Sequence, residues 1–234
     1  MRIRFKPWAR KELETSPFYI NNPKDYKNKW KTAFENNNEI RLELGCGKGN
    51  FISQASIQNP NINYIAIDLV DAMLGIAKRN IEVAYKIRKT TNKEEIENEI
   101  EKQKNVKNVK LLRYDISNIS EIFGKEDEIK RIYINFCNPW PKGKHHKKRL
   151  IFDRNLLEYK NFLKGEIYFK TDDDKLFKAS LEYFENAGYE VISKTYDLHK
   201  EENFWKDQIN IETEHEKMFT AEGIKIKALI AKLK

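Results

Sequence analysis

Residues 40–52 read IRLELGCGKGNFI, an apolar run followed at once by three glycines at alternate positions, Gly45, Gly47 and Gly49. The run predicts a buried strand, and residues 49–57 predict a helix. Glycines between a strand and a helix let the backbone approach a ligand closely, with the helix N-terminus facing it. Asn50 stands where a GxGxxG dinucleotide fingerprint needs its last glycine, which disfavours NAD or FAD. A tight turn without a ligand is the structural alternative.

The rest of the chain alternates between short apolar runs and amphipathic stretches. Strands are predicted at 40–44, 62–68, 109–114, 129–137, 166–170, 189–196 and 224–233, and further helices at 72–87, 152–163 and 176–187. Strands separated by helices of this length form βαβ crossovers, which place helices on both faces of a parallel sheet. The pattern therefore predicts an α/β fold with a seven-stranded, mostly parallel sheet, in a single domain over residues 1–234.

Three segments lie outside this alternation. Residues 1–22 are basic and aromatic, and we expect an N-terminal arm rather than part of the core. Residues 23–34 predict a short helix that begins at Pro23 and buries aromatic residues spaced by four. Residues 88–104 hold five basic and five acidic side chains, so a solvated helical extension is expected there rather than a site.

The composition favours a polyanionic partner and a reducing compartment. Forty-four Lys and Arg against 36 Asp and Glu leave a net charge of +8, which favours nucleic acid, although a lysine-rich proteome is the alternative. Cys46 and Cys137 have no CxxC spacing and are expected to be free thiols. Because no apolar run reaches the roughly 18 residues of a membrane span, and the N-terminus lacks an apolar signal region, we expect a cytoplasmic protein without a membrane partner.

Three carboxylates lie at the carboxyl ends of predicted strands. Glu43 precedes the first glycine, Asp68 ends the second strand and Asp115 follows the third. Because these ends meet at one edge of a parallel sheet, the acids are expected to converge there, on an ammonium group, ribose hydroxyls and an adenine amino group respectively. S-adenosylmethionine carries these groups and no phosphate, so it is the predicted cofactor. Alternatively, each acid caps a helix or forms a turn.

A basic loop follows the predicted strand 129–137. Residues 138–149 read NPWPKGKHHKKR, and the prolines make the loop rigid because they fix φ. Its adjacent histidines are poor metal ligands, since no third ligand follows at a suitable spacing and lysines repel cations; no metal is predicted. The side chains expected to contact RNA phosphates are Lys144, Lys147, Lys148 and Arg149. A solvated basic loop is the alternative.

The loop and its continuation, NPWPKGKHHKKRL, resemble the DPWPKKRHHKRRL-type signature of bacterial tRNA (guanine-N7-)-methyltransferases. The resemblance extends over essentially the whole chain, through LELGCGKGNFI, YIAID, YFKTDDDKLF and IETEHEKMF. It implies a Rossmann-like class I S-adenosylmethionine-dependent methyltransferase fold whose last strand is antiparallel. It also implies methyl transfer to N7 of a guanine in the variable loop of tRNA.

The resemblance further implies roles for single residues. The positions that match the family's cofactor contacts are Glu43, Asp68 and Asp115 with the three glycines, and Asn138 occupies the acidic catalytic position beside them. The positions similar to its substrate-binding residues are Lys142, Asp172, Thr213, Glu214, His215 and Glu216. This chain departs from the family pattern at two of these positions, with Asn138 in place of Asp and His215 in place of Tyr.

Several alternatives stay open. Asp172 is equally a candidate N-cap for the helix near Asp174, and Thr213 with Glu216 spells a capping box. Guanine N7 carries a lone pair and no proton, so Asn138 is predicted to orient the base rather than to accept a proton. The rival functions are a methyltransferase for rRNA or a small molecule and a non-catalytic RNA-binding protein. A monomer and a homodimer are equally compatible with the sequence.

Overall fold

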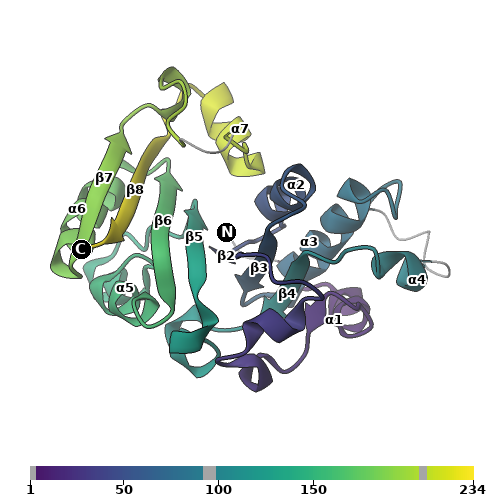
Figure 1. The fold of residues 1–234 in the computed structure, drawn as a ribbon. Coiled ribbons are helices and arrows are strands. Elements are labelled where there is room, and N and C mark those ends of the chain that lie inside the picture. Colours follow the sequence, from purple (N-terminus) through teal and green to yellow (C-terminus); the bar gives the residue numbers. More distant parts are fainter. Residues whose placement is uncertain (1–3, 92–98, 206–209) are drawn as a thin grey trace. The chain divides into compact units, whose positions relative to one another are not determined.

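The structure is a computed structural model that describes residues 4–91, 99–205 and 210–234. The chain divides into two compact units, Met1–Asp127 and Glu128–Lys234. Each unit combines strands with helices that follow them in the chain (Figure 1). We describe the two units separately.

The first unit contains four strands in the order β1-β4-β3-β2, all paired in parallel. Their bounds are β1 Tyr19–Ile20, β2 Ile40–Leu44, β3 Asn63–Asp68 and β4 Val109–Arg113. Leu44 pairs with Ile67, and Asp68 pairs with Arg113. The carboxyl ends of β2, β3 and β4 therefore lie at one edge, as the sequence predicted.

The helices of this unit are α1 Pro7–Glu14, α2 Asn50–Gln58, α3 Asp71–Ala84 and α4 Glu99–Gln103. α3 packs on β3 and β4 and also contacts α1 and α2. Short 3-10 turns span Ile116–Glu121 and Lys125–Asp127. The predicted helix at 49–57 and the predicted start of the helix at 72–87 agree with α2 and α3 to within one residue.

Part of the N-terminal segment belongs to the core, contrary to expectation. Residues 1–22 were predicted to lie outside the core, but Ala9 and Leu13 on α1 are fully buried. The guanidinium carbon of Arg79 lies 3.5 Å from the ring centroid of Trp8. Two apolar residues four apart make a narrow helical stripe, which is hard to recognise among so many basic side chains.

The segment 23–34 forms two 3-10 turns, Pro23–Tyr26 and Trp30–Ala33, rather than one helix. Between them Asn28 adopts a positive φ of 64°. The Asp127 carboxylate accepts hydrogen bonds from the Asn28 N–H at 2.9 Å and the Trp30 N–H at 3.0 Å. This long-range contact interrupts the helix, whereas the predicted burial of Trp30 is confirmed.

The charged segment 88–104 is helical at α4, while its residues 92–98 lie outside the described part of the chain. Arg88 departs from the solvated expectation because it is buried and its Nε donates to the Glu82 carboxylate at 3.1 Å.

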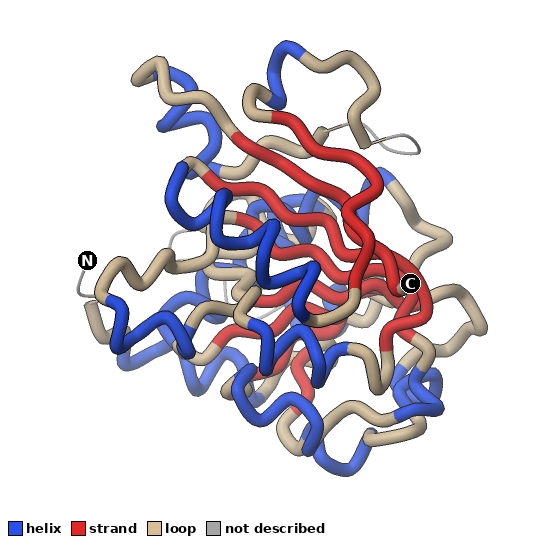
Figure 2. The backbone as a smooth tube through the Cα atoms, turned by 90° about the vertical axis from the view of Figure 1, so that its left-hand side faces the viewer, coloured by secondary structure: helices blue, strands red, loops and turns tan. Residues whose placement is uncertain are grey.

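The second unit contains four strands in the order β5-β6-β8-β7. Their bounds are β5 Ile129–Asn135, β6 Leu163–Thr171, β7 Tyr189–Thr195 and β8 Lys227–Leu233. β5 and β6 are parallel, and β8 runs antiparallel to both β6 and β7. The antiparallel last strand implied by the family resemblance is confirmed, and the C-terminus lies at its end (Figure 2).

The helices of the second unit are α5 Asp153–Tyr159, α6 Asp174–Asn186 and α7 Glu214–Ala221. α6 packs against β6, β7 and β8 and contacts α5. The predicted helix 152–163 is shorter than expected, because its last residue already belongs to β6. α7 was predicted only through its capping box.

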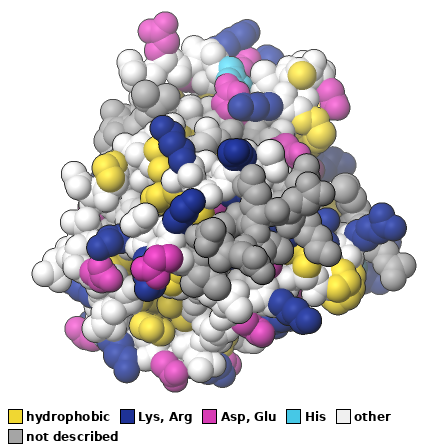
Figure 3. Space-filling model, turned by 90° about the vertical axis from the view of Figure 1, so that its right-hand side faces the viewer, with side chains coloured by type: hydrophobic (Ala, Val, Ile, Leu, Met, Phe, Trp, Pro, Cys, Tyr) yellow, Lys and Arg dark blue, Asp and Glu magenta, His cyan; other side chains and the backbone are white. Residues whose placement is uncertain are grey.

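The predicted α/β class with mostly parallel strands is confirmed, and the described part of the chain contains eight strands instead of the seven predicted. The extra strand is β1, whose two residues are too few to show a period. Both cysteines are free thiols. Within the described residues, no helix has both the length and the apolar character that crossing a bilayer requires. On the face drawn in Figure 3, basic side chains lie among acidic ones rather than in one continuous patch.

Candidate active site

The loop after β2 in the first unit is built on glycines in the left-handed region. Gly47 has φ 54°, and a Cβ placed there would meet nothing within 4 Å. Gly49 has φ 72°, and a Cβ there would lie 2.6 Å from the Cβ of Ala77 on α3. Gly49 therefore permits the close packing of α2 on α3, whereas the space beside Gly47 remains open for a ligand.

Asp68 at the end of β3 fastens this loop. Its Oδ2 accepts a hydrogen bond from the Gly47 N–H at 2.9 Å, and its Oδ1 accepts one from the Val70 N–H at 2.9 Å. Burial raises the pKa of the Asp68 carboxyl, although these backbone donors act in the opposite direction. Each carboxylate oxygen has a second lone pair, so Asp68 can hold the loop and still accept from a ribose hydroxyl.

Glu43 lies on β2 with only 2% of its surface exposed. Burial raises the pKa of the neighbouring Cys46 thiol, and the charges of Asp68 and Glu43 raise it further. Leu44 pairs with Ile67 in the sheet, so Glu43, just before Leu44, and Asp68, just after Ile67, both lie near the carboxyl ends of neighbouring strands.

Asp115 lies two residues beyond Arg113, the partner of Asp68 in the sheet. Its Oδ1 accepts from the backbone N–H and the hydroxyl of Ser117 at 2.9 and 2.8 Å, so it caps the following 3-10 turn. The side chain is exposed. Asp115 thus serves as a cap at the same sheet edge, where its exposed carboxylate can also meet a ligand.

In the second unit, Asn138 lies in the loop after β5, three residues beyond the last residue of that strand, and is exposed. Its Oδ1 accepts a hydrogen bond from the Trp140 N–H at 3.0 Å. Trp140 has φ 42° and Phe136 has φ 52°, two non-glycine residues in the left-handed region. Backbone strain of this kind is common where a loop must present side chains in a set geometry.

The burial of Arg149 contradicts its predicted role as a contact for an RNA phosphate. It is only 4% exposed, and its guanidinium donates to the carbonyl oxygen of Pro139 at 2.7 Å and to the hydroxyl of Tyr183 at 2.9 Å. Arginine presents donors in a rigid fork suited to such a clamp. Arg149 therefore holds the loop against α6 and does not face an RNA phosphate.

The loop after β5 also carries four exposed lysines, Lys142, Lys144, Lys147 and Lys148. Lys148 lies over the ring of Trp140 with its Nζ 5.0 Å from the centroid, and His145 meets the same ring edge-on at 5.7 Å. The aromatic ring therefore supports one lysine while all four ammonium groups can reach solvent.

Asp172 follows β6 and does not cap the next helix. The cap of α6 is Asp173, whose carboxylate accepts from the Leu176 N–H at 2.6 Å. Burial raises the pKa of the Asp172 carboxyl, and the charges of Lys227 and His215 partly counteract this. The structure thus removes the capping alternative and leaves Asp172 as a half-buried carboxylate directly after β6.

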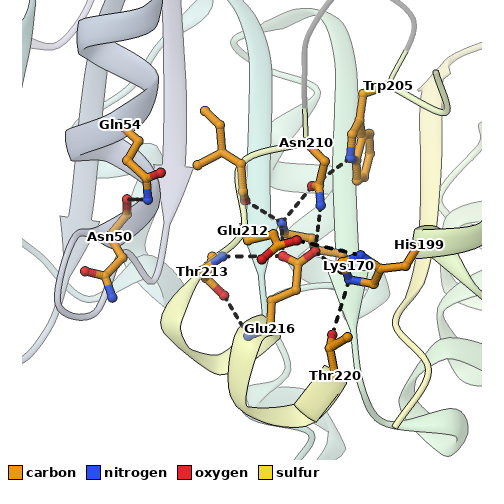
Figure 4. Close-up of polar contacts among 11 residues, drawn as sticks. Asn50, Gln54, Lys170, His199, Trp205, Asn210, Glu212, Thr213, Glu216 and Thr220 are labelled. Atoms are coloured by element: carbon orange, nitrogen blue, oxygen red, sulfur yellow. Dashed lines mark hydrogen bonds and ion pairs between the residues drawn. The ribbon is translucent and has the colours of Figure 1, made fainter. Parts of the chain in front are cut away.

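The segment Thr213–Glu216 forms the capping box of α7. The Thr213 hydroxyl accepts from the Glu216 N–H at 3.1 Å, and the Thr213 N–H donates to Glu216 Oε2 at 3.4 Å. Glu216 is fully buried, whereas Glu214 and His215 are exposed. The His215 ring stacks near Phe136, with centroids 6.3 Å apart and planes at 19°. Figure 4 shows the two hydrogen bonds between Thr213 and Glu216.

The chain matches a family model described as "Putative methyltransferase" over residues 37–229. The tRNA (guanine-N(7)-)-methyltransferase of Clostridium beijerinckii is 55% identical over 233 residues, 99% of this chain and 98% of that protein. The protein of that name from Clostridium tetani is 50% identical over 236 residues, all of both chains. The chain belongs to the tRNA (guanine-N7-)-methyltransferase family.

Solved structures support the fold. The 16S rRNA methyltransferase KamB aligns with a TM-score of 0.58 at 11% identity, covering 88% of this chain and 93% of that one. The aminoglycoside resistance methyltransferase NpmB1 aligns with a TM-score of 0.52 at 14% identity, covering 88% and 92%. The fold is thus the class I methyltransferase fold implied by the sequence.

The sequence reasoning missed Lys170, the residue that binds Glu216. Lys170 lies on β6 between Phe169 and Thr171, and all three are buried. A lysine inside a buried strand requires a partner. That requirement was readable in the motif YFKT, but only the fold reveals which acid meets it.

Proposed function

We propose that this protein transfers a methyl group from S-adenosylmethionine to N7 of a guanine in the variable loop of tRNA. The observation that carries the proposal is the match to proteins of that activity over 99% of the chain. Because one family model spans residues 37–229, which include parts of both units, we further propose that the two units act as one catalytic domain. We also propose that the protein works in the cytoplasm, as a monomer or a homodimer.

The residues of the first unit suit this cofactor. The open space at Gly47 allows close approach to the backbone, Asp68 can accept from the ribose, and the buried Glu43 can meet the ammonium group. The exposed carboxylate of Asp115 is proposed to accept from the adenine amino group. When bound, S-adenosylmethionine supplies an electrophilic methyl group on its sulfonium centre.

The residues of the second unit suit guanine. The half-buried Asp172 carboxylate can accept from the guanine N1 and N2 groups. Because N7 already carries a lone pair, no residue needs to remove a proton, and alignment of the base supplies much of the acceleration. The purine becomes positively charged as the reaction proceeds, so a nearby carboxylate stabilises that charge.

Contacts to the rest of the tRNA are assigned to the exposed lysines of the loop after β5. Such contacts neutralise phosphates and set the orientation of the RNA, while an unpaired base carries the sequence information. Asn138 is proposed to orient the guanine, with Glu214 and His215 approaching from the first turn of α7.

The experiment that tests the function is a nucleoside digest of tRNA after incubation with the protein and methyl-labelled S-adenosylmethionine. We expect the label in 7-methylguanosine. A matched tRNA in which the variable-loop guanine is replaced by adenine should remain unlabelled. Label in another nucleoside, or in rRNA but not in tRNA, would refute the proposal.

A further inference from the structure

The Lys170 ammonium group is held by polar groups inside the second unit. Its Nζ donates to the Glu216 carboxylate, to the carbonyl oxygen of Ile211 at 2.9 Å and to Oδ1 of Asn210 at 3.2 Å. An ammonium group has three hydrogens to donate, so these contacts satisfy it. Lys170 is 2% exposed, and its charge is therefore neutralised within the protein.

The Glu216 carboxylate is surrounded in the same way. Its Oε1 accepts from Asn210 Nδ2 at 2.7 Å and lies 3.3 Å from Nε2 of His199. Its Oε2 contacts Lys170 and the Thr213 N–H. Lys170, Asn210 and Thr213 donate hydrogen bonds to this carboxylate, and His199 lies beside it, as Figure 4 shows. Because Glu216 is fully buried among these groups, its carboxylate faces the protein and not a substrate.

Aromatic packing supports this cluster. The Trp205 ring stacks on Tyr168 of β6, with centroids 5.1 Å apart and planes at 18°. Its Nε1–H donates to Oδ1 of Asn210 at 3.0 Å. Oδ1 of Asn210 therefore accepts hydrogen bonds from both Trp205 and Lys170.

The cluster lies beside the first turn of α7. His215 in this turn is exposed and stacks near Phe136, which lies two residues before Asn138. The Nζ of Lys170 also lies 5.8 Å from the centroid of Phe136. Lys170 thus contacts both segments that carry proposed substrate residues, the loop after β5 and the first turn of α7.

We propose that Lys170 is a positioning residue for methyl transfer, which acts by holding Glu216 and thereby the first turn of α7. The inference rests on the proposed function and deepens it. Glu216 acts through Lys170 and not on the base, while Glu214 and His215 are the residues of this turn that meet the guanine.

The test compares Lys170→Met, Glu216→Gln and the double variant Lys170→Met/Glu216→Gln. We expect kcat on tRNA to fall on the order of 10²-fold in each, because a displacement of about 1 Å can cost that much. The KM for tRNA should change little, since phosphate contacts supply most of the affinity. S-adenosylmethionine affinity, measured by calorimetry, should be unchanged because its proposed residues lie in the first unit.

The double variant is decisive because it leaves no unpaired buried charge and is expected to fold even if a single variant does not. Its loss should be no larger than that of either single variant, because residues that act as one unit are not additive. A double variant with wild-type kcat would overturn the inference. So would losses that multiply, since Glu216 would then act independently of Lys170.

Lys232→Met is the matched control. Lys232 lies on β8 of the same sheet and pairs with Glu190 at 3.4 Å, but both side chains are about half exposed. Removing this pair should leave kcat, KM and cofactor affinity unchanged. If methyl transfer to tRNA is absent even in the unaltered protein while the cofactor binds, the proposed function fails and not the positioning role.

Discussion

The sequence predicts that segments 43–49 and 213–216 both bind ligands, but the surroundings of their residues differ in the structure. The first leaves open space beside the Gly47 backbone, and Asp68 holds that backbone in place. The second turns Thr213 and Glu216 inward, where they cap α7 and neutralise Lys170. Residues in a binding motif can therefore serve either the ligand or the geometry that presents other residues.

The physical difference lies in what each residue type needs. A glycine brings no side chain, so a ligand can approach its backbone closely. A buried carboxylate must be paired or hydrogen-bonded, and in 213–216 those partners come from the protein itself. The same division separates the buried Arg149 from the exposed lysines beside it.

The largest effect is expected at Asp68. Asp68→Ala removes two charge-assisted hydrogen bonds, one from Gly47 in the glycine loop and one from Val70, each worth about 1.5–3 kcal/mol, together with the proposed ribose contact. S-adenosylmethionine affinity should fall on the order of 10²-fold or more by calorimetry. Asp68→Asn, which keeps one acceptor oxygen, should lose less. If Asp68→Ala binds normally, the loop is not the cofactor site.

Arg149 and its neighbouring lysines extend the comparison to the loop after β5. Arg149→Ala should destabilise the protein by about 2–4 kcal/mol, because it removes buried charged hydrogen bonds. Thermal unfolding measures this effect. The salt dependence of tRNA binding should stay as in the unaltered protein.

The variant Lys144→Ala/Lys147→Ala/Lys148→Ala should show the opposite pattern. Its thermal stability should be unchanged. The slope of log affinity against log salt should decrease by about 0.7–0.9 for each phosphate that the protein no longer neutralises. A reduced slope in Arg149→Ala, or an unchanged slope in the triple variant, would reverse the assignment of these residues.

Alanine substitutions at Gly47 and Gly49 are expected to distinguish an effect on packing from an effect on cofactor binding. Gly47→Ala should cost about 1 kcal/mol through its positive φ, whereas Gly49→Ala should cost about 1–3 kcal/mol more because its Cβ overlaps Ala77. Denaturant unfolding should rank them in that order. Cofactor affinity should show the reverse ranking, with Gly47→Ala the more damaging.

The smallest effect is expected at Asn138. Asn138→Asp retains an oxygen that can accept from the Trp140 N–H, and N7 needs no base, so the methylation rate should change less than about tenfold. The pH–rate profile should also keep its shape. A larger increase with a new pH dependence would show that a carboxylate there takes part in proton transfer.

The sequence by itself determined the α/β class, the positions of most strands and the glycine loop. These features depend on local periodicity and on residues adjacent in the chain. The capping box at Thr213 and Glu216 was also readable, because its two members are three residues apart. The family followed from motifs distributed over the whole chain.

Only the tertiary structure decided which of these residues are buried and which partners they contact. The burial of α1, the interruption between Pro23–Tyr26 and Trp30–Ala33, the inward Arg149 and the Lys170–Glu216 pair depend on partners distant in the sequence. A charged side chain carries no local sign of whether water or a buried partner will neutralise it. For Lys170 and Glu216, the buried partner is supplied when β6 packs against the segment before α7.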